Sequence, residues 1–179
     1  MPSMPLNVGE MDKYYLFPGE IFSSKKSHIV DTILGSCVAV FLWDPVLQFA
    51  SINHYMLPLC NKEGSLSYKY GNVAIPELIK RMLKMGSSKN DLKAKIFGGS
   101  EIGHSNPAFN IGERNIILAT TLLNNEKIPI ISHSVGGNLG RKVIFHSASG
   151  EVFISYISQG INTVIDNESN RFNHNLTHR

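Results

Sequence analysis

Cys37 and His54 are the two residues of this sequence whose types and spacing most directly suggest chemistry. Cys37 follows Gly35 and Ser36, and His54 lies in the segment Asn-His-Tyr-Met-Leu-Pro that ends at Pro58. A histidine beside a cysteine can take the thiol proton and leave a thiolate, which is the form that attacks carbonyl carbons. The pair therefore predicts a thiol nucleophile that is activated by an imidazole, with a lowered thiol pKa.

The elements expected to position this pair are the two strands of one β-hairpin. Residues 38–42 and 49–55 are rich in β-branched and aromatic residues, and an Asp-Pro pair between them is a turn signal. A hairpin that is symmetric about the 45–46 peptide bond places Cys37 directly opposite His54. Directly opposed residues have Cβ atoms about 4.5–5.5 Å apart, although a β-bulge would shift the register.

A cysteine in an apolar context is often only a small buried hydrophobe, so its neighbours matter. Gly35 and Ser36 favour catalysis, because their backbone N–H groups can line a site for an oxyanion. A third group usually orients the histidine, and Asp31, Thr32 and Ser36 are the nearest candidates. In an unbroken strand only Asp31 would share the face of Cys37, but Gly35 interrupts the alternation, so the choice stays open.

The remaining pattern predicts an α+β sandwich of mostly antiparallel strands with two main helices. Apolar spacing over residues 75–83 predicts an amphipathic helix that has Pro76 in its first turn, and a second helix is expected to open at Asn110. Further short strands are expected at 14–17, 21–23, 28–33, 95–97, 128–132, 142–146 and 152–156. We expect one domain over residues 1–179, with a core at about 14–157 and a loosely ordered polar tail at 158–179.

Composition excludes several classes of function. The formal charge is +3 and the 17 Lys and Arg residues are scattered, so nucleic-acid binding is not expected. The glycine clusters lack phosphate-loop spacing, and the histidines lack metal-ligand spacing apart from His174 and His178 in the polar tail; His104 is expected in a loop. We therefore expect no cofactor and no metal. Two cysteines make no disulfide framework and no apolar run reaches transmembrane length, so a cytoplasmic protein without membrane insertion is expected.

Six segments of the sequence, in order, resemble the CheD family of chemoreceptor glutamine deamidases from bacterial chemotaxis. They begin at Thr32, Trp43, Asn53, Lys95, Asn110 and Val135, and they read TILGSCVAV, WDP, NHYMLP, KIFGG, NIGERN and VGG followed by GRKVIF. The resemblance covers about residues 14–157. One departure is Ser134, which stands where the family often has an acidic residue before Val-Gly-Gly.

The resemblance implies a cysteine hydrolase that converts glutamine side chains of methyl-accepting chemotaxis receptors to glutamate and ammonia. The family's nucleophile falls on Cys37, its histidine on His54, and its third residue on Thr32, with Asp31 possible if the loop differs by one residue. An alternative is a non-enzymatic chemotaxis regulator that binds a CheC-type phosphatase. A papain-type protease fits less well, since its Cys and His lie far apart in sequence. Gly98-Gly99 and Gly136-Gly137 are expected at the rim of the site, where they would let a receptor helix approach.

Overall fold

The computed structural model describes residues 11–62, 64, 66–101 and 109–157 of the chain. Within these residues two α-helices and nine strands follow one another, with one short 3-10 helix at Lys89–Asp91. The strands are β1 (Asp12–Tyr15), β2 (Ile21–Ser24), β3 (His28–Leu34), β4 (Val38–Asp44), β5 (Phe49–Asn53), β6 (Lys93–Gly98), β7 (Ile130–Val135), β8 (Gly140–His146) and β9 (Val152–Ile157). The helices are α1 (Gly71–Lys84) and α2 (Ile111–Asn125).

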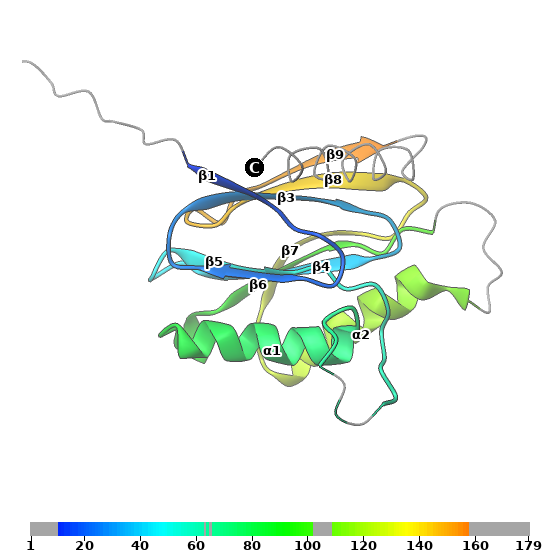
Figure 1. The fold of residues 1–179 in the computed structure, drawn as a ribbon, viewed down its shortest axis with the longest axis horizontal. Coiled ribbons are helices and arrows are strands. Elements are labelled where there is room, and N and C mark those ends of the chain that lie inside the picture. The colour runs from blue at the N-terminus through cyan, green and yellow to red at the C-terminus, as the bar shows by residue number, and fades with distance from the viewer. Residues whose placement is uncertain (1–10, 63, 65, 102–108, 158–179) are drawn as a thin grey trace, which may run out of the picture.

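Two sheets lie face to face, and both helices cover the outer face of one of them (Figure 1). The first sheet has the order β1-β3-β8-β9, and the second has the order β2-β5-β4-β6-β7. Only the β1–β3 and β6–β7 pairs are parallel. The predicted α+β sandwich of mostly antiparallel strands with two main helices is confirmed.

The central strand β4 contributes to two apolar clusters, one on each face of its sheet. Ala39 and Phe41 face the other sheet, where Phe145 of β8 belongs to the same cluster, as does Phe97 of the adjacent strand β6. Val38, Val40 and Leu42 belong to the cluster beneath the two helices. This alternation is the two-residue period of a strand that is buried on both faces. Successive side chains of β4 therefore point into different layers of the fold.

The first helix begins earlier than the sequence pattern indicates. Tyr70 is its N-cap and Gly71 its first residue, so Pro76 lies in the second turn and not in the first as expected. Proline has no N–H, so the helix gives up one main-chain hydrogen bond at this point. No helix in the described part of the chain is long and apolar enough to cross a membrane. The predicted tail, residues 158–179, lies outside the described residues.

Candidate active site

The β4–β5 hairpin exists, but its register differs by two residues from the expected one. Asp44 pairs with Phe49, so the turn comprises residues 45–48. The Asp44 carboxylate sets this longer turn by accepting the N–H groups of Val46 and Leu47, each at 2.9 Å. Because two is an even shift, every side chain keeps the face that the shorter turn would have given it.

His54 and Cys37 are therefore diagonal neighbours across the end of the hairpin. An isolated bridge joins Val38 to Tyr55, which sets Cys37 opposite Met56 and His54 opposite Ala39. Diagonal positions on one face lie about 7–8 Å apart, within reach of long side chains. The ladder loosens at this point, since the Asn53 side chain takes the Val40 N–H at 2.9 Å.

Cys37, His54 and Thr32 belong to the layer between the two sheets. Cys37 is partly buried against the inter-sheet cluster, whereas His54 is only 1% exposed and Thr32 is fully buried. Thr32 alternates with Val30 and Leu34, which point into the same layer. The structure thus brings a hydroxyl from one sheet against the imidazole of His54, in the layer against which Cys37 also packs.

Thr32 determines which ring nitrogen of His54 carries a proton. Its Oγ1 lies 2.7 Å from the Leu16 carbonyl and 2.8 Å from Nδ1 of His54. A carbonyl can only accept, so the single hydroxyl proton goes to Leu16, and Nδ1–H donates to Thr32. In the neutral ring Nε2 is then the basic nitrogen. Nε2 is buried and has no hydrogen-bond partner among the described residues.

Burial favours the uncharged forms of both reactive groups. It lowers the pKa of His54 to about 4, while proximity to the Leu16 carbonyl opposes the shift. It raises the pKa of the Cys37 thiol to about 11, although the residue's own backbone N–H favours the thiolate. The expected lowered thiol pKa is therefore wrong for the substrate-free site, because desolvation outweighs the other contributions. The resting pair is a neutral thiol and a neutral imidazole.

The raised pKa of the Cys37 thiol predicts how its alkylation rate depends on pH. In a Cys60→Ala background, the rate at which iodoacetamide labels Cys37 should still rise with pH between about 8 and 10, because the thiol stays mostly protonated there. A small free thiol with a pKa of about 8.5 is the reference, and its rate levels off in this range. A Cys37 rate that reached its plateau near pH 8 would contradict the raised pKa.

The segment that precedes the nucleophile is held by the loop after β6. The Ser100 N–H donates to the Gly35 carbonyl and the Gly99 N–H to the Cys37 carbonyl, each at 2.8 Å. Gly98 has a φ of 105°, and a Cβ there would lie 2.2 Å from the Cys37 carbonyl oxygen. The expectation that Gly98 and Gly99 form an open rim is wrong: both are buried and support the nucleophile from behind.

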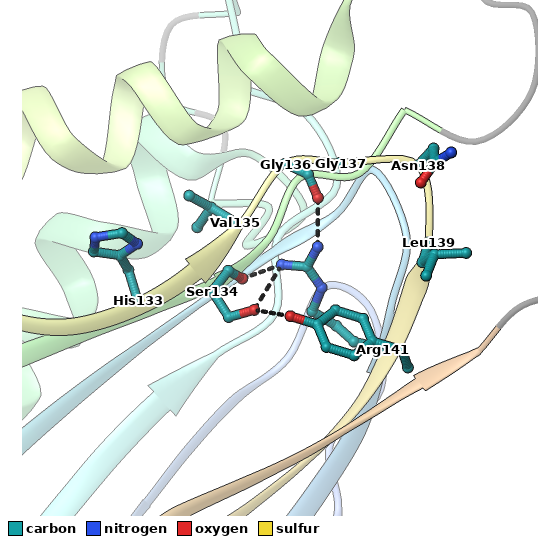
Figure 2. A pocket seen from close by; sticks show the side chains of 9 residues that line it. His133, Ser134, Val135, Gly136, Gly137, Asn138, Leu139 and Arg141 are labelled. Atoms are coloured by element: carbon teal, nitrogen blue, oxygen red, sulfur yellow. Dashed lines mark hydrogen bonds between the residues drawn. The ribbon is translucent and has the colours of Figure 1, made fainter.

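A pocket of about 390 Å³ lies beside the 136–139 loop, and Figure 2 shows Arg141 among its lining residues, hydrogen-bonded to its neighbours. Arg141 is 2% exposed, and its guanidinium donates to Ser134 and Gly136, and to the Ser100 hydroxyl at 3.2 Å. At the position of the family's acidic residue, Ser134 thus offers neutral oxygens, and no carboxylate pairs with Arg141 in the described part of the chain. Arg141 joins β7 to the loop that supports Cys37.

Other candidates lie away from the site. The neighbour of Thr32, Asp31, points to the opposite face of β3 and pairs with Lys142 at 3.4 Å, so it does not contact His54. Cys60, the second cysteine, is also outside any disulfide and lies in a different loop. Among the described residues no group of His, Cys, Asp and Glu could hold a metal ion. His104 lies outside these residues, as do both histidines of the tail.

Comparisons with a family model and with curated proteins agree on one family. Residues 56–156 match the family model described as "CheD chemotactic sensory transduction". A Sulfurimonas denitrificans protein is 39% identical over 152 residues, covering 84% of this chain and 97% of its own. A Trichlorobacter lovleyi protein is 43% identical over 143 residues, covering 79% of this chain and 89% of its own. Both carry the name "Probable chemoreceptor glutamine deamidase CheD".

Proposed function

This chain belongs to the CheD family, and we propose that it deamidates glutamine side chains of methyl-accepting chemotaxis receptors, with Cys37 as nucleophile and His54 as general base. The names of its relatives support the reaction. The observation that carries the assignment of residues is the Thr32–His54 hydrogen bond, because it leaves Nε2 as the basic nitrogen on the face that also bears Cys37. The substrate would be the cytoplasmic part of a receptor.

The chemistry begins with a neutral thiol. As Sγ of Cys37 attacks the carboxamide carbon, Nε2 of His54 takes the thiol proton, so no free thiolate has to exist beforehand. The carbonyl oxygen becomes an oxyanion that the backbone N–H groups of Ser36 and Cys37 can bind; in comparable sites one such donor is worth about 3–4 kcal/mol.

The intermediate collapses when Nε2 returns its proton to the amide nitrogen. Ammonia leaves, and the substrate acyl group stays on Cys37 as a thioester. A water molecule then gives a proton to Nε2 and attacks the thioester carbon, after which the thiol is regenerated and a glutamate side chain is released. The net reaction consumes one water and produces one ammonia for each glutamine.

The hairpin end offers access for a side chain from a protein substrate. Ser36 is exposed, and Met56, which faces Cys37 in the register, is 39% exposed. Cys37 as a residue is partly buried, not fully enclosed. A glutamine side chain is long enough to reach a recessed thiol while its own backbone stays outside.

The deciding experiment is incubation of the reduced, full-length protein with a purified cytoplasmic receptor fragment. Mass spectrometry should find the small mass gain of amide-to-acid conversion at specific glutamines, together with released ammonia. A folded wild-type protein that leaves every glutamine unchanged would reject deamidation. That result would favour the alternative, a non-enzymatic regulator that binds a CheC-type phosphatase.

Thr32→Val tests the role of the hydroxyl. The change keeps the shape but removes the acceptor for Nδ1–H, so the ring can rotate or adopt the other tautomer. We expect kcat to fall about 10- to 100-fold with little change in KM, the size of effect that hydrogen-bond partners have where they orient metal-binding histidines. The assay is steady-state deamidation of the receptor fragment.

Ser51→Ala is the matched control for this variant. Ser51 is also fully buried, and its hydroxyl donates to the Phe22 carbonyl at 2.9 Å without touching His54. Each variant removes a buried hydroxyl that donates to a backbone carbonyl, which should cost about 1–3 kcal/mol of unfolding free energy. Equal losses of kcat in the two variants would show that Thr32 matters only for stability.

A further inference from the structure

Asn115 on α2 has a buried side-chain amide that contacts the open end of the β4–β5 hairpin, on both of its arms. Its Nδ2 donates to the Ser36 carbonyl at 2.9 Å and to the Met56 carbonyl at 3.0 Å. Its own backbone carbonyl accepts the Tyr55 hydroxyl at 2.5 Å. One residue therefore joins the segment before Cys37 to the segment that follows His54.

The orientation of this amide has only one solution. Both of its main partners are carbonyl oxygens, which accept and never donate, so the NH₂ group must face them. A flipped Asn115 would set its oxygen against two others. Asn115 is fully buried, and its Oδ1 has no partner within the described residues. This position therefore requires a side-chain nitrogen that carries two hydrogens.

Close packing brings α2 near enough for this contact. A Cβ on Gly112 would lie 2.4 Å from the Gly99 carbonyl oxygen, so the first turn of α2 rests directly on the loop that supports the nucleophile. Glu101 from the same loop accepts the Gly112 N–H at 2.8 Å. The helix start and the loop form one unit, and Asn115 extends from that unit to the Ser36 carbonyl.

With Asn115 in place, all three carbonyls of the segment 35–37 are held. The carbonyls of Gly35 and Cys37 accept backbone N–H groups of the loop 98–100. The Ser36 carbonyl between them accepts the side-chain NH₂ group of Asn115. In a trans peptide the N–H points away from the preceding C=O. The N–H groups of Ser36 and Cys37 therefore point away from these partners, and neither has an acceptor in the described part of the chain.

We infer that Asn115 is a positioning residue for the reaction: by holding the Ser36 carbonyl it fixes the Ser36–Cys37 peptide plane, and so aims the Cys37 N–H at the oxyanion that forms during attack. The inference rests on the proposed deamidation. The Cys37 N–H and Sγ belong to one residue, and this N–H has no acceptor among the described residues, so it is a free donor beside the carbon that the sulfur attacks. Donors that are fixed before reaction stabilise developing charge without reorganisation.

Asn115→Ala separates this role from activation of the thiol. Deamidation passes through an oxyanion, whereas alkylation by iodoacetamide displaces iodide from a saturated carbon and forms none. We expect kcat for a receptor fragment to fall about 10- to 100-fold, somewhat less than the loss of a direct oxyanion donor. KM should change by no more than about threefold, and the alkylation rate of Cys37 at pH 8.5 in a Cys60→Ala background should stay within about twofold of its parent.

Asn72→Ala is the matched control. Asn72 on α1 also uses one amide to tie a helix to a loop, through the N–H and C=O of Cys60 at 2.9 and 3.3 Å, and it contacts nothing in the segment 35–37. Its kcat should remain close to that of wild type. A second test variant, Asn115→Leu, keeps roughly the size of the side chain but offers no donor, and it should lose kcat as Asn115→Ala does.

Each outcome decides between the two proposals. Unchanged kcat in both Asn115 variants would overturn the positioning role, as would a parallel loss of kcat and alkylation, which would indicate general collapse of the loop. If neither variant folds, judged by circular dichroism, Asn115 is a structural residue and the inference fails. A wild-type protein without deamidase activity would instead reject the proposed function.

Discussion

Cys37→Ala is expected to lose deamidation of a receptor fragment by at least about a thousand-fold, because the variant has no atom that can form the thioester. The fold should survive. Cys37 is only partly buried at the edge of the inter-sheet cluster, so replacing its thiol by a hydrogen should cost about 1 kcal/mol of unfolding free energy. Turnover is measured by mass spectrometry of the fragment and stability by thermal unfolding.

Cys60→Ala provides the comparison. Neither thiol is in a disulfide, but Cys60 lies in the loop that Asn72 holds, away from the segment that carries Cys37. Its removal should leave turnover close to wild type. Equal losses in the two variants would mean that the thiols act through structure and not through chemistry, and full activity in Cys37→Ala would remove the nucleophile from the proposed mechanism.

The hairpin that carries the candidate site could be predicted from the sequence, whereas its register could not. Strand composition and an Asp-Pro signal are local, so both arms were found. The turn length depends on which backbone N–H groups the Asp44 carboxylate accepts, and it accepts those of Val46 and Leu47. The prediction that Cys37 and His54 share a sheet face was insensitive to this error, because faces depend only on even or odd spacing.

The choice between Thr32 and Asp31 needed the second sheet. Strand alternation counted along the chain from Cys37 selects Asp31 only for an unbroken strand, and it left the choice open. Residues 35–37 lie outside both strands, and the chain passes from one sheet to the other there. In the structure Thr32 points inward to His54 and Asp31 pairs outward with Lys142. No local pattern carries this information, because the deciding contact joins different sheets.

The upward shift of the Cys37 thiol pKa and the role of Asn115 could not be predicted from the sequence, for a related reason. A histidine partner suggests a lowered thiol pKa, but the amount of apolar surface around Cys37 follows from the packing of two sheets. Asn115 lies 79 residues after Ser36, whose carbonyl it holds. The motif Asn-Ile-Gly-Glu-Arg-Asn could be recognised as a helix start, yet only the fold shows where its last side chain points.

His54→Ala should lower kcat by about 10²- to 10⁴-fold, the usual contribution of a general base. The variant also leaves a cavity in a fully packed layer, so unfolding free energy should fall by about 1–3 kcal/mol. His28→Ala is the control, since that ring bonds the Lys26 carbonyl at the far end of β3. A His54→Ala enzyme with nearly normal kcat would show that another group takes the thiol proton.

Combining His54→Ala with Thr32→Val tests whether the hydroxyl works through the imidazole. Thr32 has two partners, the Leu16 carbonyl and Nδ1 of His54. If its catalytic effect is only to orient the ring, the double variant should be no slower than His54→Ala alone, because without the ring there is nothing left to orient. If instead the two losses of kcat multiply, Thr32 contacts the substrate or water directly, and its place in the mechanism changes from a positioning residue to a catalytic one.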